Sequence, residues 1–390
     1  MKRILGVVVL LVAMALPQLL FAETGYDGGF YIKNDEDTFK LKINGRFQPE
    51  LFYARETLDD VANGHYQNRT SFSIRRAEAV FNASIRDKFS FNVGMKHATN
   101  SSNFNTLNVS GATGTYSFVP EFNITAGMVG LPLSIMADTS SKWFLLTSAP
   151  ITDVQDDGIE NFTISRLSFS IPDGLGLNFS GDIWKFFYSA SVVNGNESNY
   201  TFNNGNKFSF GARVGFNILG AVPGSMTDFA CSDSPNLTVS LGSMYQAKRN
   251  YMVNGGLATI KYMWTSSAGV ALRWGGFALT TEGYYRRLRL TNPGGAIWAR
   301  PTMDDIGYYG AVGYYIIPKT FEVALQAGQI FREGPDNNSN SFGGGLNYYI
   351  FDNNLKLQLS YIWTEDYDDI WGGQNNNNIS LVTLMLSAAF

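Results

Sequence analysis

The sequence predicts an all-β protein, an antiparallel barrel of about 16 strands that crosses a membrane. Apolar and polar residues alternate along most of the chain, and tight turns alternate with long polar connections. From Phe39 to Tyr53, one parity carries apolar and aromatic side chains and the other carries Lys, Asn, Arg, Gln and Glu. Successive side chains of a strand point to opposite faces, so this segment has one face suited to lipid and one suited to water. It is also longer than the about 9–11 residues that a strand needs to cross a bilayer.

The composition agrees with interleaved rather than blocked apolar residues. Charged residues make up 16% of the 390 residues and the mean hydropathy is −0.08, whereas a soluble domain has roughly 25% charged residues. Beyond residue 22, no apolar run approaches the ~18 residues of a membrane-spanning helix. The single cysteine, Cys231, excludes an intrachain disulfide framework.

The first residues have the pattern of a secretory signal. Lys2 and Arg3 precede an apolar core at 4–16, and Ala22 ends the stretch. We therefore expect a signal peptide at 1–22 and a barrel domain at 23–390. The short segment 26–37 is interpreted as a polar lead-in to the first strand.

The remaining strands follow from the same alternation. They are expected at 72–86, 89–98, 122–129, 162–171, 175–181, 184–193, 208–218, 237–246, 257–264, 268–275, 277–288, 306–317, 320–331, 343–351, 355–364 and 379–390. Long polar connections are expected at 55–71, 99–120, 195–206, 291–305, 333–341 and 365–378. Long connections on one rim and tight turns on the other are typical of outer-membrane barrels, whose strand number is even.

One segment, 130–160, breaks the alternation. It is too apolar for a freely solvated loop, because it contains the cluster Trp143-Phe144-Leu145-Leu146, and so we expect it to pack against the rest of the protein. Its charged residues are Lys142 and the carboxylates Asp138, Asp153, Asp156, Asp157 and Glu160.

Basic residues on the polar parity are the candidates for lining a pore. They are Lys40, Lys42, Arg46, Arg76, Arg86, Lys96, Arg166 and Arg213. A pore selects by the charges that line it, and guanidinium groups bind carboxylate or phosphate bidentately. Two interpretations stay open: these residues guide anions, or they pair with lumenal carboxylates and stiffen the wall. Arg75 falls on the opposite, lipid-facing parity.

Other chemistries find little support in the sequence. His65 and His97 lie in no triad or metal-ligand setting, and Cys231 has no cysteine partner for a chelate. The acidic residues at 153–160 lack the spacing of a calcium loop, and the net charge of −4 excludes a large basic surface for nucleic acid. We therefore expect no catalytic residues, no metal and no cofactor.

The sequence resembles the phosphate-selective porin O and P family of Gram-negative outer membranes. The resemblance rests on motifs in order along the chain: Phe72 to Ala77, Ala212-Arg213-Val214, Glu282-Gly283-Tyr284-Tyr285, Gly307-Tyr308-Tyr309, Gly344-Gly345-Leu346-Asn347-Tyr348-Tyr349 and Asn353-Asn354-Leu355-Lys356-Leu357. It implies a homotrimer of 16-stranded barrels in which 130–160 folds inward and narrows the pore. The terminal Phe390 resembles the signal that the barrel assembly machinery recognises. Unlike the lysine-lined constriction of phosphate selectors, 130–160 contains only Lys142.

The expected function is passive diffusion of small hydrophilic solutes and ions across the outer membrane, with a preference for anions such as phosphate or other oxyanions. A non-selective or cation-preferring porin is the first alternative. An outer-membrane barrel enzyme and a secreted β-sandwich adhesin are alternatives of other classes.

Overall fold

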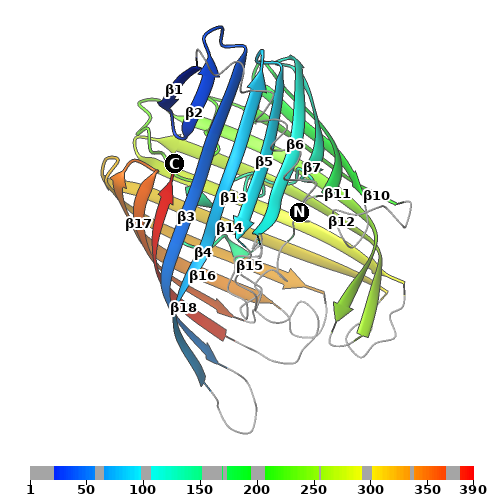
Figure 1. Ribbon diagram of the computed structural model, residues 1–390. Helices are drawn as coiled ribbons and strands as arrows, with labels where there is room; N and C mark the ends of the chain where they lie inside the picture. The colour runs from blue at the N-terminus through cyan, green and yellow to red at the C-terminus, as the bar shows by residue number, and fades with distance from the viewer. Residues whose placement is uncertain are drawn as a thin grey trace.

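The computed structural model describes residues 22–57, 66–97, 107–151, 169, 174–194, 207–253, 256–291, 301–333, 338–365 and 378–390. Its described strands form one antiparallel sheet (Figure 1). They are β1 (Ala22–Tyr26), β2 (Phe30–Asn34), β3 (Phe39–Thr57), β4 (Tyr66–Ile85), β5 (Phe89–His97), β6 (Leu107–Val119), β7 (Phe122–Val129), β8 (Gly174–Ile183), β9 (Phe186–Asn194), β10 (Phe208–Asn217), β11 (Asn236–Val253), β12 (Gly256–Trp274), β13 (Phe277–Leu290), β14 (Thr302–Ile317), β15 (Phe321–Arg332), β16 (Ser339–Phe351), β17 (Leu355–Glu365) and β18 (Asn378–Ala389).

The wall is a closed barrel of 16 strands, β3 to β18. Each strand pairs with the next, and β18 returns to pair with β3 along 378–389. The alternation sets the two faces: Phe47 and Tyr53 are exposed on the outside, whereas Gln48 and Glu50 are buried on the inside. The predicted fold class is therefore confirmed, and the segments expected at 257–264 and 268–275 are one strand, β12.

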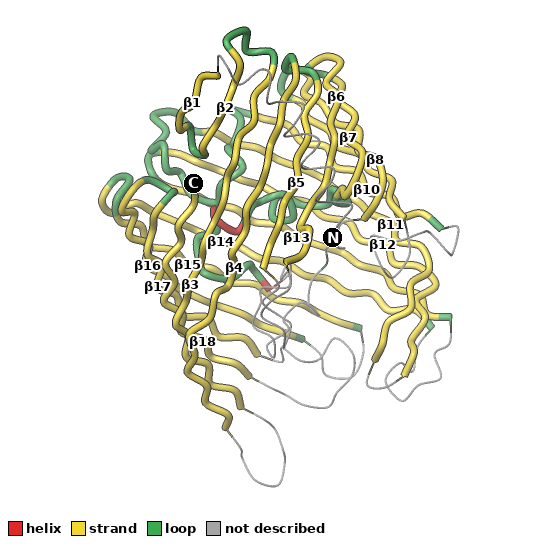
Figure 2. The backbone as a smooth tube through the Cα atoms, viewed as in Figure 1, coloured by secondary structure: helices red, strands yellow, loops and turns green. Residues whose placement is uncertain are grey.

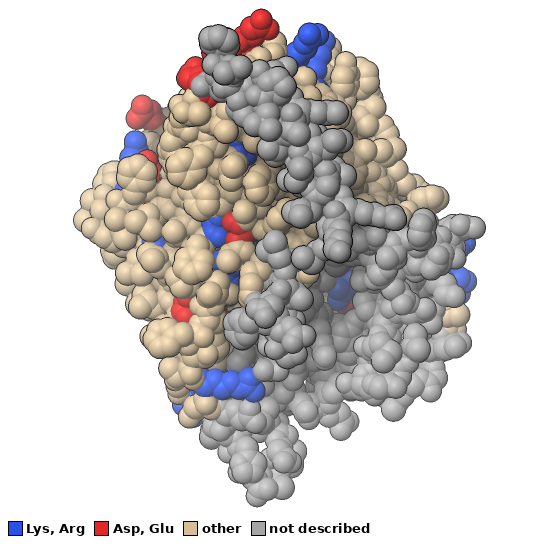
Figure 3. All heavy atoms as spheres, in the orientation of Figure 1, with Lys and Arg blue, Asp and Glu red and all other residues tan. Residues whose placement is uncertain are grey.

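The outer surface fits a membrane environment. In Figure 3, the described part of this face is mainly uncharged, and several acidic and basic residues stand at its top edge, near the short turns. Within the described ranges, no helix has the length and apolar character of a membrane-spanning helix.

Strand β6 corrects the prediction of a long loop at 99–120. Its small residues, among them Gly111 and Gly114, hide the alternation that Tyr116 and Phe118 continue on the outer face. A register shift against β5 leaves Ser110 as an extra residue, which further obscures the period of two. The strand expected at 162–171 lies outside the described residues except for Phe169, which is fully buried.

A second register shift moves Arg75 to the inside of the barrel. Gln48 lies opposite Arg76 and Pro49 lies opposite Ile74, so Arg75 is the additional residue of a bulge. Proline has no N–H to donate to the ladder, which favours an irregularity at this point. The Arg75 guanidinium is buried beside the Met385 sulfur, so its predicted lipid-facing position is wrong.

The segment 26–37, predicted as a lead-in, belongs mainly to a β-hairpin. β1 pairs with β2, and β2 pairs with β3 from Phe30 opposite Ile43 to Lys33 opposite Lys40. The hairpin continues the edge of β3 beyond the end of β18, where Phe390 exchanges two backbone hydrogen bonds with Gly45. The expected signal peptide, 1–22, lies outside the described residues except for Ala22.

Candidate functional site: the lumenal constriction

The chain from 130 to 151, which we call the inward loop, follows β7 and packs against the inner wall (Figure 2). Its first half is held by side chains of the wall. Glu282 of β13 accepts hydrogen bonds from the backbone N–H groups of Ile135, at 2.7 Å, and Met136, at 2.9 Å. Ser267 of β12 donates to the carbonyl of Leu133 at 2.5 Å. These contacts fix the loop by its backbone, so they constrain its path whatever side chains it carries.

The second half of the inward loop is held by β16 and β17. Asn347 donates to the carbonyl of Leu145 at 2.9 Å, and Gln358 donates to the carbonyl of Phe144 at 3.2 Å. The hydroxyls of Thr147 and Ser360 also share a hydrogen bond. Backbone polar groups inside the barrel need partners, and the wall supplies them with side-chain amides and hydroxyls.

Glycines on the inner wall make room for the loop. A Cβ atom at Gly345 would come within 2.6 Å of the Leu146 side chain, and one at Gly313 would come within 2.6 Å of Leu145. A Cβ at Gly242 would come within 1.8 Å of the Leu133 carbonyl oxygen. Only glycine fits at these positions, because loop atoms occupy the space that a larger side chain would fill.

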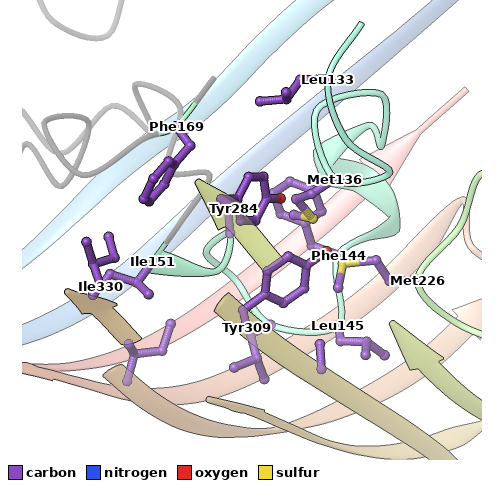
Figure 4. Packing of buried hydrophobic residues seen from close by; sticks show 14 of the residues in the cluster. Leu133, Met136, Phe144, Leu145, Ile151, Phe169, Met226, Tyr284, Tyr309 and Ile330 are labelled. Atoms are coloured by element: carbon purple, nitrogen blue, oxygen red, sulfur yellow. The ribbon is translucent and has the colours of Figure 1, made fainter. Parts of the chain in front are cut away.

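Apolar side chains of the loop form the core of the molecule inside the barrel. Leu133, Met136, Phe144 and Leu145 are almost completely buried and belong to one cluster that includes wall residues such as Tyr309 (Figure 4). This explains why 130–151 is too apolar for a solvated loop.

The tip of the inward loop reaches the opposite side of the lumen. A short 3-10 helix, η2 (Ser141–Trp143), lies beside β3, where Arg46 donates to the hydroxyl of Ser141 at 2.9 Å. Arg46 also forms an ion pair with Glu78 of β4, with its Nε 2.6 Å from the carboxylate. The loop therefore spans from the wall of β10–β17 to β3.

Three basic residues converge at this tip: Lys42, Arg46 and Lys142, which we call the basic cluster. Desolvation lowers the pKa of Lys142, and the positive charges of Arg46 and Lys42 lower it further. The Lys142 ammonium lies 4.7 Å from the ring centroid of Trp143. Among the described residues, no carboxylate lies within ion-pair distance of Lys142. Within the basic cluster, Arg46 pairs with Glu78 and Lys42 with Asp27, whereas Lys142 has no such partner among the described residues.

Arg213 is used differently. It donates to the Ser134 carbonyl at 2.6 Å and forms an ion pair with Asp138, both on the inward loop. The side chain of Asp138 is half exposed. Desolvation by the surrounding protein nevertheless raises the pKa of Asp138 above its usual value, and the charge of Arg213 only partly opposes this shift. Arg213 therefore anchors the loop through contacts that balance much of its charge.

The other predicted pore-lining residues have varied positions. Lys40 and Lys42 lie 4.0 Å and 3.6 Å from the Asp27 carboxylate, which is largely exposed. Lys96 is exposed at the end of β5, and Arg76 is partly buried on the inner face of β4. Arg86 was predicted to line the pore, and this prediction is wrong. Arg86 is exposed in the turn after β4, beyond the end of the strand, with φ of 51°. Five candidates lie outside the described residues: Arg166, Asp153, Asp156, Asp157 and Glu160.

The inner wall has an open side and a covered side. Lumenal residues of β4, β5 and β8, such as Asn82, Asn92 and Asn178, keep partial exposure. Those of β13 and β17 under the inward loop do not: Thr280 and Gln358 are 1% exposed. The partly exposed lumenal residues thus lie on the side of the wall that carries Lys42 and Arg46.

Several charged residues of the covered side were missed by the sequence analysis, which placed the basic candidates in the first half of the barrel. Arg286 and Asp305 form a buried ion pair, and Lys356 and Arg273 are also buried. Arg273 donates to the Ser225 carbonyl at 3.1 Å. Each of them falls on the polar, inward-facing parity of a strongly alternating strand, and this was the available signal. Over the described ranges, no group of three or more His, Cys, Asp or Glu residues could hold a metal ion.

A family model decides the identification. Residues 42–387 match the model of the phosphate-selective porin O and P family. The chain belongs to this family. It is therefore an outer-membrane porin, as the sequence resemblance indicated.

Solved structures share the fold of this family member. The anion-selective porin from Comamonas acidovorans has a TM-score of 0.59 at 12% identity, covering 90% of this chain and 100% of that one. The trimer form of OmpT from Vibrio cholerae has a TM-score of 0.57 at 11% identity, covering 91% and 100%. The channel DcaP of Acinetobacter baumannii has a TM-score of 0.56 at 13% identity, covering 92% and 99%. A search of curated protein sequences gives no match.

Proposed function

We propose that this porin is a passive diffusion channel for small hydrophilic solutes that prefers anions, and that Lys42, Arg46 and Lys142 set this preference. The observation that carries the proposal is the convergence of these three cations at the loop tip, on the open side of the wall. Glu78 balances part of the charge of Arg46, and Asp27 balances part of the charge of Lys42, so the net field comes mainly from Lys142.

The size of the effect follows from Coulomb's law. One unit charge roughly 6 Å from a passing ion contributes about 0.7 kcal/mol in water, which is a threefold bias for anions and a similar bias against cations. Salt screens this interaction over about 10 Å at 0.1 M, so the preference should weaken at high ionic strength. Phosphate and other oxyanions fit the lysine and guanidinium donors, which bind such groups by charge-assisted hydrogen bonds.

We also propose that residues 1–22 act as a signal peptide, that the barrel assembly machinery recognises Phe390, and that the mature barrel forms a homotrimer. The trimer form of the structurally similar OmpT supports the last of these. No enzymatic role is proposed, because membership of a porin family accounts for the barrel and its inward loop.

The reversal potential of the purified protein in a planar bilayer, across a potassium chloride gradient, tests the proposal. We expect an anion preference that falls in Lys142→Gln and falls further when Lys42→Gln is added. Lys185→Gln is the matched control, because Lys185 lies in the turn after β8, outside the constriction. Cation preference in the wild type, or equal potentials in all variants, would contradict the assignment.

A further inference from the structure

A second segment of the chain enters the barrel from the opposite rim. The rim of tight turns connects its strands by two or three residues, as at 86–88 and 275–276, but β10 and β11 are joined by residues 218–235, which we call the rim segment. The rim segment is not extended into solvent: Met226, Thr227 and Asp228 are 2%, 3% and 3% exposed. Such burial requires that it pack inside the barrel mouth.

The rim segment is anchored by several directed contacts. Arg273 of β12 donates to the Ser225 carbonyl, and Asp228 accepts a hydrogen bond from the Gly276 N–H at 2.8 Å. The ring of Phe229 packs against the rings of Tyr315 and Tyr349, with centroids 6.1 Å and 5.5 Å away. These contacts hold both the backbone and the side chains of the segment against the inner wall.

The two inward segments touch each other. The backbone N–H of Met226 donates to the Trp143 carbonyl at 3.3 Å, and Met226 shares a hydrophobic cluster with Phe144 and Leu145 (Figure 4). Trp143 directly follows Lys142 of the basic cluster. The rim segment therefore supports the inward loop one residue away from its cationic tip.

A buried carboxylate joins the two segments through the wall. Glu322 of β15 is 0% exposed and accepts hydrogen bonds from the Thr227 hydroxyl at 2.6 Å, from Asn347 at 2.9 Å and from the Tyr349 hydroxyl at 2.7 Å. Asn347 in turn donates to the Leu145 carbonyl of the inward loop. Glu322 is thus placed between Thr227 of one segment and Leu145 of the other.

We propose that the rim segment is a second constricting element, which holds the inward loop in place from the tight-turn rim, and that Glu322 is the positioning residue that couples the two. This inference rests on the proposed function only in assuming that the lumen conducts. Loss of the coupling releases the tip of the inward loop, so the channel should admit larger solutes, conduct more and fluctuate more.

The test compares two substitutions of Thr227 with each other. Thr227→Val keeps the shape and removes the hydroxyl, whereas Thr227→Ser keeps the hydroxyl that Glu322 accepts. We expect Thr227→Val to raise single-channel conductance, open-channel noise and the size limit for polyethylene glycols that enter the pore. Thr227→Ser should retain the wild-type values. Equal behaviour of the two variants would overturn the role of Glu322.

A second measurement does not depend on conduction. In a Cys231→Ser background, the double substitution Trp143→Cys and Met226→Cys should allow a disulfide to form on mild oxidation of the folded protein in detergent. A reversible mobility shift on a gel detects it. Thr227→Val should slow the disulfide. Absence of the disulfide in folded protein would overturn the contact between the segments. A disulfide in a protein that conducts no ions would support the contact while contradicting the proposed function.

Discussion

The substitution Glu282→Ala is predicted to release the inward loop from the wall. Glu282 accepts hydrogen bonds from the N–H groups of Ile135 and Met136 and from the hydroxyls of Tyr284, at 3.1 Å, and Tyr309, at 2.7 Å. Alanine removes all four acceptor contacts and leaves two backbone donors of the loop without their partner.

The expected magnitude follows from the backbone donors alone. Each buried N–H that loses its acceptor costs about 1–3 kcal/mol, so the attached loop is destabilised by roughly 2–6 kcal/mol. Every ~1.4 kcal/mol is a factor of ten in an equilibrium constant, so the population of the displaced loop rises about 30-fold or more. The barrel itself keeps its strand pairing, because Glu282 belongs to the wall through its backbone.

Single-channel recording and limited proteolysis measure this outcome. We expect larger and noisier conductance for Glu282→Ala, and faster cleavage of the inward loop in the folded protein. Tyr284→Phe is the graded control, because it removes one donor to Glu282 but leaves both contacts to the loop backbone. Conductance and cleavage equal to wild type in a folded Glu282→Ala variant would refute the reasoning.

Three further predictions use other contacts. Gly345→Leu should lower the apparent unfolding temperature on a heated gel, because the added Cβ would come within 2.6 Å of Leu146 and overpacking costs about 1–3 kcal/mol. The control Gly344→Ala faces outward and should be tolerated. Equal losses of unfolding temperature in the two variants would contradict this. The anion preference should decline as pH rises through the lowered pKa of Lys142, below the ordinary lysine value of 10.5, and Lys142→Arg should retain it to higher pH; identical pH profiles would argue against Lys142. Phe390→Ala should reduce the folded fraction in the outer membrane, since the Phe390 ring lies over Gly45. An unchanged amount of folded protein would contradict a role of Phe390 in assembly.

The wall of the barrel could be predicted from the sequence because it depends on a local rule. Alternation assigns Phe47 outward and Gln48 inward without knowledge of any neighbour. The rule fails where one extra residue enters a strand. The bulge opposite Pro49 turns Arg75 inward, and the alternation of residues gives no sign of this bulge. Small residues, as in β6, also weaken the alternation of apolar and polar side chains that predicts a strand.

The site could be predicted only in outline. The apolar content of 130–160 indicated that this segment packs against the protein, and the parity of Arg46 and Arg213 placed them inside the barrel. The partners of these residues come from distant parts of the chain: Arg46 contacts Ser141, 95 positions away. The rim segment has no periodic signal at all, and the burial of Met226 depends on contacts that only the closed barrel creates.

The central claim is that solutes pass along the open side of the wall while the inward segments cover the other side. Cysteine accessibility tests it directly: Asn92→Cys and Thr280→Cys, each in a Cys231→Ser background, are treated with an anionic methanethiosulfonate reagent during bilayer recording. We predict a stepwise fall in conductance for Asn92→Cys, whose position is partly exposed to the lumen, and none for Thr280→Cys, which is 1% exposed. Block at Thr280→Cys with no effect at Asn92→Cys would place the conducting path on the opposite wall and contradict the account.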